Sequence, residues 1–108
     1  MQYVVEYFNE RVLAEVERWP DDVLADDARL VELLAEFGPQ LRLPHSRAMG
    51  GGLFELRARG SEVIGRALYC YVVGRRVVLL HAFVKKTPAT ARRDLAVARR
   101  RMREVRGG

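Results

Sequence analysis

Arginine and lysine residues recur along one stretch of this chain at positions that could bind phosphate. The stretch is residues 53–86, LFELRARGSEVIGRALYCYVVGRRVVLLHAFVKK, and it holds three strand-like runs separated by glycine. Arg57 lies in the first run, Arg66 in the second, and Lys85 and Lys86 end the third. Neighbouring strands bring side chains together, and a guanidinium grips two phosphate oxygens at once. A phosphate between Arg57 and Arg66 is therefore geometrically reasonable.

Each of these cations also has a purely structural interpretation. Arg57 could form a cross-strand ion pair, for instance with Glu62, and Arg66 could form a similar one. Lys85 and Lys86 could serve only to keep the end of a strand in solvent. The sequence leaves these alternatives open.

Side chains that could move a proton lie in the same stretch. The candidates are His81, Tyr69, Tyr71 and Glu55. Histidine has a near-neutral reference pKa, so His81 could act as an acid or as a base. His81 also shares its strand parity with Leu79, however, and could be a buried, hydrogen-bonded histidine of the core. For the two tyrosines, aromatic packing is the alternative.

The three runs predict an antiparallel meander with one polar face. Side chains on a strand alternate between the two faces of a sheet. In the first run, one face receives Phe54, Leu56 and Ala58, and the other receives Glu55, Arg57 and Arg59. Gly60 and Ser61, and then Gly74, sit where the two turns must be.

A short strand and a helix are predicted before the meander. Residues 3–7, YVVEY, are typical of a strand. Asn9 can cap the helix that follows, and Trp19 with Pro20 ends it. We expect the indole of Trp19 to fill part of the core.

Two more helices complete the predicted fold. Asp21 or Asp22 caps the second helix, which a Gly38-Pro39 stop signal ends, so the first two helices form a hairpin. The last helix is predicted to start at Thr87-Pro88. Its apolar residues recur at steps of four and three, which gives one stripe for packing on the sheet: Ala91, Leu95, Ala98, Met102 and Val105. The arginines around that stripe form a solvated face or a surface for a nucleic-acid backbone.

Residues 39–52, PQLRLPHSRAMGGG, are predicted to form a flexible basic loop. Three successive glycines resemble a phosphate-binding loop only superficially, because no Lys-Ser/Thr pair follows them. Arg47 lies in this loop. His45 has no partner spaced for metal ligation, so we expect no metal site.

The composition predicts one cytoplasmic domain. The chain has 108 residues, of which 49% are hydrophobic, which suits a single domain with a real core. Its one cysteine, Cys70, excludes a disulfide framework, and we expect a buried thiol. The first ten residues carry charge and lack the apolar run of a signal peptide, and no stretch is long enough for a membrane helix.

Charge is divided sharply along the chain. Residues 1–38 hold three basic and ten acidic residues, whereas residues 39–108 hold sixteen basic and four acidic ones. A half with a net charge of +12 favours a polyanionic partner, because neutralised phosphates release their counterions. The alternative is a general preference for arginine, since only two of the 19 basic residues are lysines.

Four short motifs then carry a resemblance to a known family. They are GLFELR at 52–57, GRALY at 65–69, VVLLHAF at 77–83 and KKTP at 85–88. In this order, with the acidic hairpin and the last helix, the chain resembles type II toxins of the RelE/ParE superfamily, in particular its phage-derived HigB-like branch. The resemblance implies one α+β domain over residues 1–108. It would hold an N-terminal strand, a helical hairpin, a three-strand antiparallel meander and a C-terminal helix packed on the sheet.

The resemblance also implies a function. Such toxins are cytoplasmic endoribonucleases that cut mRNA, usually on the ribosome, without a metal or other cofactor. A cognate antitoxin, usually of helix-turn-helix type, neutralises them, and DNA is bound only through the complex with the antitoxin. The resemblance implies catalytic roles for Arg57, Arg66 and Lys86, with Lys85 as a second choice because only one of two successive strand residues faces the site. To these we add His81 as a catalytic residue from its own acid–base chemistry. Our candidates for substrate binding are Lys85, Phe83, Arg47 and Arg92. Many relatives carry a tyrosine or histidine near the C-terminus, but this chain has neither after His81.

Two other functions stay open. A toxin of the same fold could act on a protein target such as gyrase, as ParE-like members do, and would need no cluster of phosphate-binding cations. A non-catalytic module for binding RNA or DNA would also explain the basic half of the chain.

Overall fold

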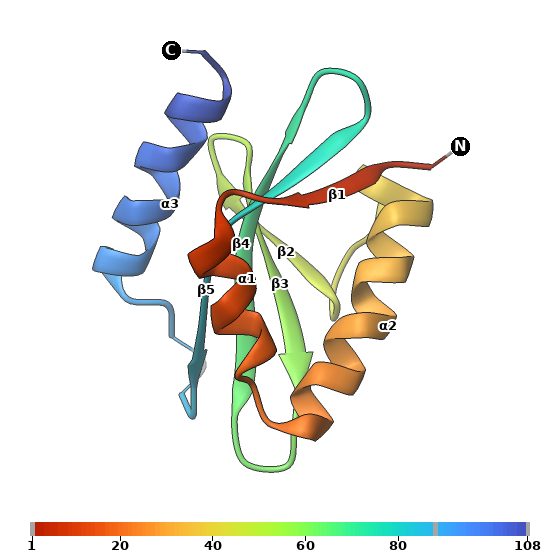
Figure 1. The fold of residues 1–108 in the computed structure, drawn as a ribbon, viewed down its shortest axis with the longest axis vertical. Coiled ribbons are helices and arrows are strands. Elements are labelled where there is room, and N and C mark those ends of the chain that lie inside the picture. The colour runs from red at the N-terminus through yellow and green to blue at the C-terminus, as the bar shows by residue number, and fades with distance from the viewer. Residues whose placement is uncertain (1, 88, 108) are drawn as a thin grey trace.

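A five-stranded sheet forms the centre of the molecule (Figure 1). The computed structural model describes residues 2–87 and 89–107. The strands are Val4–Tyr7 (β1), Ser46–Gly50 (β2), Leu53–Arg59 (β3), Ile64–Val72 (β4) and Arg76–Lys85 (β5). Their order across the sheet is β1-β5-β4-β3-β2, with β1 parallel to β5 and every other neighbouring pair antiparallel. The predicted meander is therefore confirmed as β3, β4 and β5, and the N-terminal strand joins its edge.

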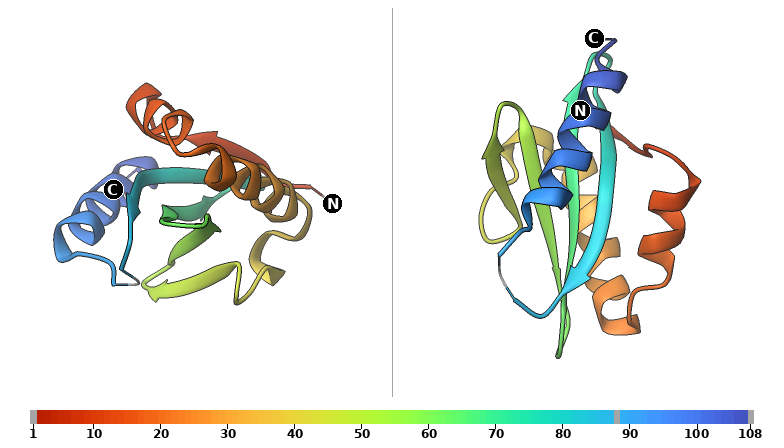
Figure 2. Two further views of the ribbon diagram at one scale, coloured as in Figure 1. Left: turned by 90° about the horizontal axis from the view of Figure 1, so that it is seen from below. Right: turned by 90° about the vertical axis from the view of Figure 1, so that its left-hand side faces the viewer.

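Helices cover both faces of the sheet (Figure 2). Glu10–Glu17 (α1) and Asp21–Phe37 (α2) pack on one face, and Arg92–Val105 (α3) packs on the other. A short 3₁₀ helix, Gly38–Gln40 (η1), follows α2. The α+β fold expected from the sequence is confirmed. Among the described helices, none combines the length and the apolar character that a membrane span requires.

The predicted N-caps of the two hairpin helices have different outcomes. Asn9 caps α1 as predicted, because its Oδ1 accepts a hydrogen bond from the amide of Val12. The predicted cap of α2 is wrong: Pro20 occupies the N-cap position. Asp22 instead accepts a hydrogen bond from the backbone amide of Ser61, in the β3–β4 turn. This long-range contact fixes that turn against α2 and outweighs a local cap.

Trp19 lies in the core, as expected, against a glycine of β4. Only 4% of Trp19 is exposed. A Cβ atom on Gly65 would lie 2.6 Å from Val23 and 2.8 Å from the indole of Trp19. Glycine at this position therefore allows the turn between α1 and α2 to approach the sheet closely.

Strand β2 is the largest departure from the sequence-based prediction, which has residues 39–52 as a loop. The observed strand pairs with β3 from Ser46 opposite Leu56 to Gly50 opposite Leu53, with a register shift after Ala48. The hydroxyls of Ser46 and Tyr69 form a buried hydrogen bond that ties β2 to the sheet. As an edge strand with mostly exposed residues, β2 lacks the alternation of apolar side chains by which strands are found.

The last helix begins later than predicted. Helix α3 starts at Arg92, with Ala91 as its N-cap, whereas the sequence indicated a start at Thr87-Pro88. Pro88 itself lies outside the described residues. The carbonyl of Thr87 and the hydroxyl of Thr90 both accept hydrogen bonds from Arg66 on β4. The chain before α3 is thus held against the sheet instead of continuing the helix.

A register shift in β5 decides where His81 points. Tyr69 of β4 pairs with Leu79, and the preceding Leu68 pairs with His81, so Leu80 is an extra residue on β5. The extra residue reverses the strand alternation beyond it. His81 therefore lies on the face covered by α3, with Leu68, and not on the face of Leu79 as the sequence parity suggested.

Candidate active site

Polar side chains gather on the face of the sheet that α3 covers, here called the α3 face. Residues paired across neighbouring strands share a face, so their order can be read from the register. One row across the sheet is Arg57, Arg66 and Phe83. The adjacent row is Arg47, Glu55, Leu68 and His81. The α3 face thus brings together residues from four strands.

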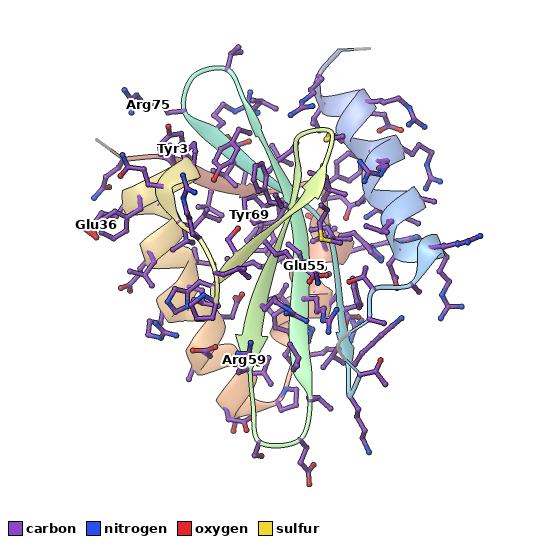
Figure 3. All side chains as sticks on the ribbon, turned by 180° about the vertical axis from the view of Figure 1, so that it is seen from behind. Tyr3, Glu36, Glu55, Arg59, Tyr69 and Arg75 are labelled. Carbon is purple, nitrogen blue, oxygen red and sulfur yellow. The ribbon has the colours of Figure 1, made fainter. Side chains whose placement is uncertain are left out.

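The carboxylate of Glu55 lies between the guanidinium groups of Arg57 and Arg66. Its Oε1 is 3.4 Å from Nε of Arg57, and its Oε2 is 3.6 Å from Nη1 of Arg66. Glu55 is fully buried, and Figure 3 shows it at the centre of the sheet, on the side of α3. The ion pair predicted for Arg57 as the structural alternative exists, but its partner is Glu55 and not Glu62.

Arg66 is enclosed by the chain that leads into α3. Its Nη1 donates to Oγ1 of Thr90 at 2.9 Å, and its Nη2 donates to the carbonyl of Thr87 at 2.8 Å. The Thr90 hydroxyl donates in turn to Oε2 of Glu55. Burial lowers the pKa of Arg66, and the positive charges of Arg57 and Arg47 lower it further. The negative charge of Glu55 opposes this decrease but does not outweigh it. The predicted position of a phosphate between the two arginines is therefore held by Glu55 in this structure.

Asp94, in the first turn of α3, joins His81 to Lys85. Its Oδ1 is 2.8 Å from Nε2 of His81, and its Oδ2 is 3.2 Å from Nζ of Lys85. Burial would raise the pKa of Asp94, but the hydrogen bonds and charges of His81 and Lys85 outweigh it and hold that pKa below its usual value. His81 is thus neither isolated nor part of an apolar core: about a fifth of its side chain is exposed, and one ring nitrogen is engaged.

Phe83 packs between the same groups. Its ring centroid lies 5.5 Å from that of His81, and Nζ of Lys85 lies 5.4 Å from the ring centroid of Phe83. Lys85 therefore shares the α3 face with His81 and Phe83. Lys86 follows the last residue of β5 and is exposed. By its position, Lys85 is therefore a better candidate on this face than Lys86.

The two remaining substrate-binding candidates lie at the margins of this face. Arg47 is exposed on β2, at the end of the row that contains Glu55. Arg92 is exposed at the first position of α3, two residues before Asp94. Both side chains could therefore reach a ligand that lies along the α3 face.

The two tyrosine candidates for proton transfer lie on the other side of the sheet. Tyr69 and Tyr71 belong to the cluster beneath α1 and α2, with ring centroids 5.8 Å apart. Burial raises the pKa of Tyr69. It also raises the pKa of Tyr71. Aromatic packing, the alternative given by the sequence, is their observed role.

Sequence reasoning missed Asp94 and Thr90. Residues 39–108 hold only four acidic residues, so an aspartate in the first turn of a strongly basic helix is a signal that points to Asp94. Thr90 gave no such signal, because it was expected inside the helix. Its contact with Glu55 and Arg66 depends on the late start of α3.

Comparisons with known proteins place the chain in a family and support its fold. Residues 14–103 match the model of the family described as "Phage derived protein Gp49-like (DUF891)". The chain belongs to the Gp49-like family. Its fold is similar to that of a chain in the crystal structure of the archaeal RelE-RelB complex from Pyrococcus horikoshii OT3. The TM-score is 0.57 at 19% sequence identity, over 82% of this chain and 100% of that one. A comparison with curated proteins gave no match.

The family model spans every element of the site in this Gp49-like chain except α3's last turn. Matched residues include Glu55, Arg57, Arg66, His81 and Asp94. At 19% identity, the archaeal complex speaks for the fold alone. The phage-derived family that the sequence motifs indicated is therefore confirmed, and the expected fold is similar to that of a chain in the RelE-RelB complex.

Proposed function

We propose that this Gp49-like protein is the toxin of a type II toxin–antitoxin system, of the HigB-like branch, and an endoribonuclease that cleaves mRNA on the ribosome. The observation that carries the proposal is the grouping of Arg57, Lys85 and His81 on the α3 face, with Asp94 bonded to two of them. Such a set of cations around a histidine suits a phosphodiester whose charge increases during reaction.

Cleavage without a metal would follow the usual chemistry of RNA. The 2′-oxygen attacks the adjacent phosphorus, its proton passes to a base, and the P–O5′ bond breaks as the departing 5′-oxygen gains a proton. The products are a 2′,3′-cyclic phosphate and a free 5′-hydroxyl. His81 is our candidate for one of the two proton transfers, since Nε2 faces Asp94 and the ring retains a second nitrogen. Arg57 and Lys85 would stabilise the negative oxygens.

Arg66 would support the site without contacting the substrate. Because Thr87, Thr90 and Glu55 surround its guanidinium, Arg66 is suited to hold Glu55 and the chain before α3 in place. Glu55 in turn orients Arg57, the more accessible of the two arginines. Arg66 is therefore a positioning residue in this proposal. Lys85 takes the catalytic role that the sequence first gave to Lys86. Roles for Lys86, Arg47, Phe83 and Arg92 as substrate contacts stay predictions.

A cognate antitoxin is the implied protein partner. The similar archaeal fold comes from a complex whose name pairs RelE with RelB. We extend that pairing to this chain, with a helix-turn-helix antitoxin, DNA contact only through the complex, and action in the cytoplasm. Neither a membrane nor a cofactor enters the proposed reaction.

Inducible expression in a bacterium, with mapping of mRNA 5′ ends, tests the proposal. We expect growth arrest and new in-frame cuts with the wild type, and the loss of both with His81→Ala and with Arg57→Ala. Arg75→Ala is the matched control, because Arg75 is exposed in the β4–β5 turn and stacks on Tyr3, away from α3 (Figure 3). Arrest without cuts would instead support a protein target such as gyrase. No arrest would leave a nucleic-acid-binding module.

A further inference from the structure

A basic pocket lies beside β5, between α1 and α3. Its volume is about 410 Å³, and its walls come from α1, β5 and α3. In the views of Figure 2, β5 passes between these two helices. The charged and titratable residues that line it are Arg11, Glu15, Arg18, His81 and Arg101. Three guanidinium groups and one carboxylate thus line a pocket that is large enough for a nucleotide.

Arg11 of α1 and Arg18, the C-cap of that helix, are basic residues in an otherwise acidic segment. Residues 1–38 contain only three basic residues, and two of them, Arg11 and Arg18, line this pocket. They are seven residues apart and so lie on the same side of the helix. Glu15, between them, pairs with Arg18 at 2.8 Å. This leaves the pocket with a net positive charge.

Arg101 gives the pocket a cation that is already fixed in position. Its Nη1 donates to the carbonyl of Leu80 at 2.7 Å, and its guanidinium stacks on the ring of Phe8 at 4.9 Å. Burial and the nearby charges of Arg100 and Arg11, partly opposed by Glu104, lower the pKa of Arg101. The like charges of Arg11 and Arg101 therefore repel each other in the free protein. An anion between them would remove that repulsion.

His81 connects this pocket to the proposed active site. It lines the pocket while its Nε2 bonds Asp94 on the α3 face. Phe83, in the row of Arg57, is two residues further along β5, a step of about 7 Å on a strand. A nucleic-acid strand that crosses β5 could therefore place one phosphate near Arg57 and another in the pocket.

We propose that the pocket between α1 and α3 binds a backbone phosphate of the RNA strand, next to the phosphate that reacts. This inference rests on the proposed function and assigns Arg11, Arg18 and Arg101 to a second phosphate subsite. The site would hold the strand on both sides of His81. It would thus set the orientation of the reacting nucleotide and carry out no chemistry itself.

The salt dependence of RNA binding tests the subsite. The probe is a short, fluorescently labelled single-stranded RNA with 2′-O-methyl groups, which can bind but cannot be cleaved. Affinities are measured by anisotropy at several salt concentrations for the wild type and for Arg11→Ala/Arg18→Ala. We expect weaker binding by the variant and a slope of log K against log salt that is smaller by about 0.7 per lost phosphate contact. Both residues are exposed, so the fold should not change.

Two further variants separate the pocket from general charge. Arg29→Ala/Arg75→Ala removes the same charge from exposed positions outside the pocket and should keep the wild-type slope. Arg11→Lys/Arg18→Lys should restore most of the slope. The subsite would be overturned if the slope did not change in Arg11→Ala/Arg18→Ala, or if it decreased equally in the control. In that case, mRNA cleavage by the wild type would still support the proposed function. A wild type that neither binds nor cleaves RNA would overturn both.

Discussion

At the scale of single residues, the α3 face holds its cations together with one buried anion. Glu55 contacts both Arg57 and Arg66, and Thr90 donates a hydrogen bond to the same carboxylate. Without Glu55, two guanidinium groups on paired residues of neighbouring strands would repel each other at close range. The carboxylate therefore lies, in the free protein, where the sequence predicts a bound phosphate.

Replacing Glu55 by glutamine should turn this face into a site for free phosphate. We expect Glu55→Gln to lower the free energy of unfolding by about 3 kcal/mol, because it leaves a buried ion pair without its anion. Inorganic phosphate should then raise the melting temperature of the variant more than that of the wild type, at equal ionic strength in chloride. Exposed Glu62→Gln is the control. Equal responses to phosphate in the variant and the wild type would contradict this view of Glu55.

Asp94 should affect cleavage more than stability. Its two oxygens hold His81 and Lys85, so Asp94→Asn should misplace the proposed acid–base group and release a cation. We expect kcat for mRNA cleavage in a ribosome-containing translation mixture to fall about 100-fold, with little change in KM. Asp94→Glu should recover part of the rate. Exposed Glu104→Gln, on the same helix, should behave like the wild type. A loss confined to KM would instead give Asp94 a role in binding.

At the scale of elements, the sequence predicts what depends on local alternation and misses what depends on distant contacts. Strand β3 was predictable, and with it the polar face of Arg57, because six of its residues alternate cleanly. The extra residue Leu80 was not, since a bulge is defined by the partner strand. It moved His81 to the side of the arginines, which made the histidine a better candidate than its parity implied. The late start of α3 likewise depends on Arg66, 21 residues before Thr87.

Helix α2 carries a buried carboxylate that should make stability depend on pH. Burial, and to a lesser extent the charge of Asp26, raise the pKa of Asp27 to about 6. Since the folded protein then holds this proton more tightly than the unfolded chain, the contribution of Asp27 to stability is fully present below about pH 4 and is lost as pH rises through about 6. Asp27→Asn should therefore raise the free energy of unfolding by about 2 kcal/mol at pH 8.

Urea unfolding at several pH values measures this effect, and the gain should disappear near pH 4. Asp26 is the control of opposite sign. Burial would raise its pKa, but the amide of Arg59 and the guanidinium of Arg29 outweigh it and lower that pKa. Asp26→Asn should thus destabilise the protein above pH 4, an effect lost as pH falls. A gain from Asp27→Asn that did not change with pH would indicate packing in place of ionisation.

At the scale of the whole molecule, the sheet separates two hydrophobic cores of unequal size. The larger lies under α1 and α2 and includes Val16, Trp19 and Leu34. The smaller lies under α3, where Met102 and Ala98 cover Cys70 and Leu80. Helix α3 rests on this smaller core, with Ala98 and Met102 as its buried apolar residues. We therefore expect it to be the first helix to open in the native state.

The single cysteine can report that opening. Cys70 is buried beneath α3, and burial raises the pKa of its thiol, so a thiol reagent should react only when α3 lifts from the sheet. Met102→Ala should weaken the docking of α3 by about 2 kcal/mol and speed Cys70 labelling about 30-fold. Leu34→Ala, in the other core, should lower global stability and leave labelling in native conditions almost unchanged. If both variants speed labelling in proportion to their loss of global stability, α3 opens only when the whole protein unfolds. If only Met102→Ala speeds labelling, α3 opens by itself, and Asp94 leaves His81 each time it does. The rate of mRNA cleavage should then decrease as the fraction of molecules with an open α3 increases.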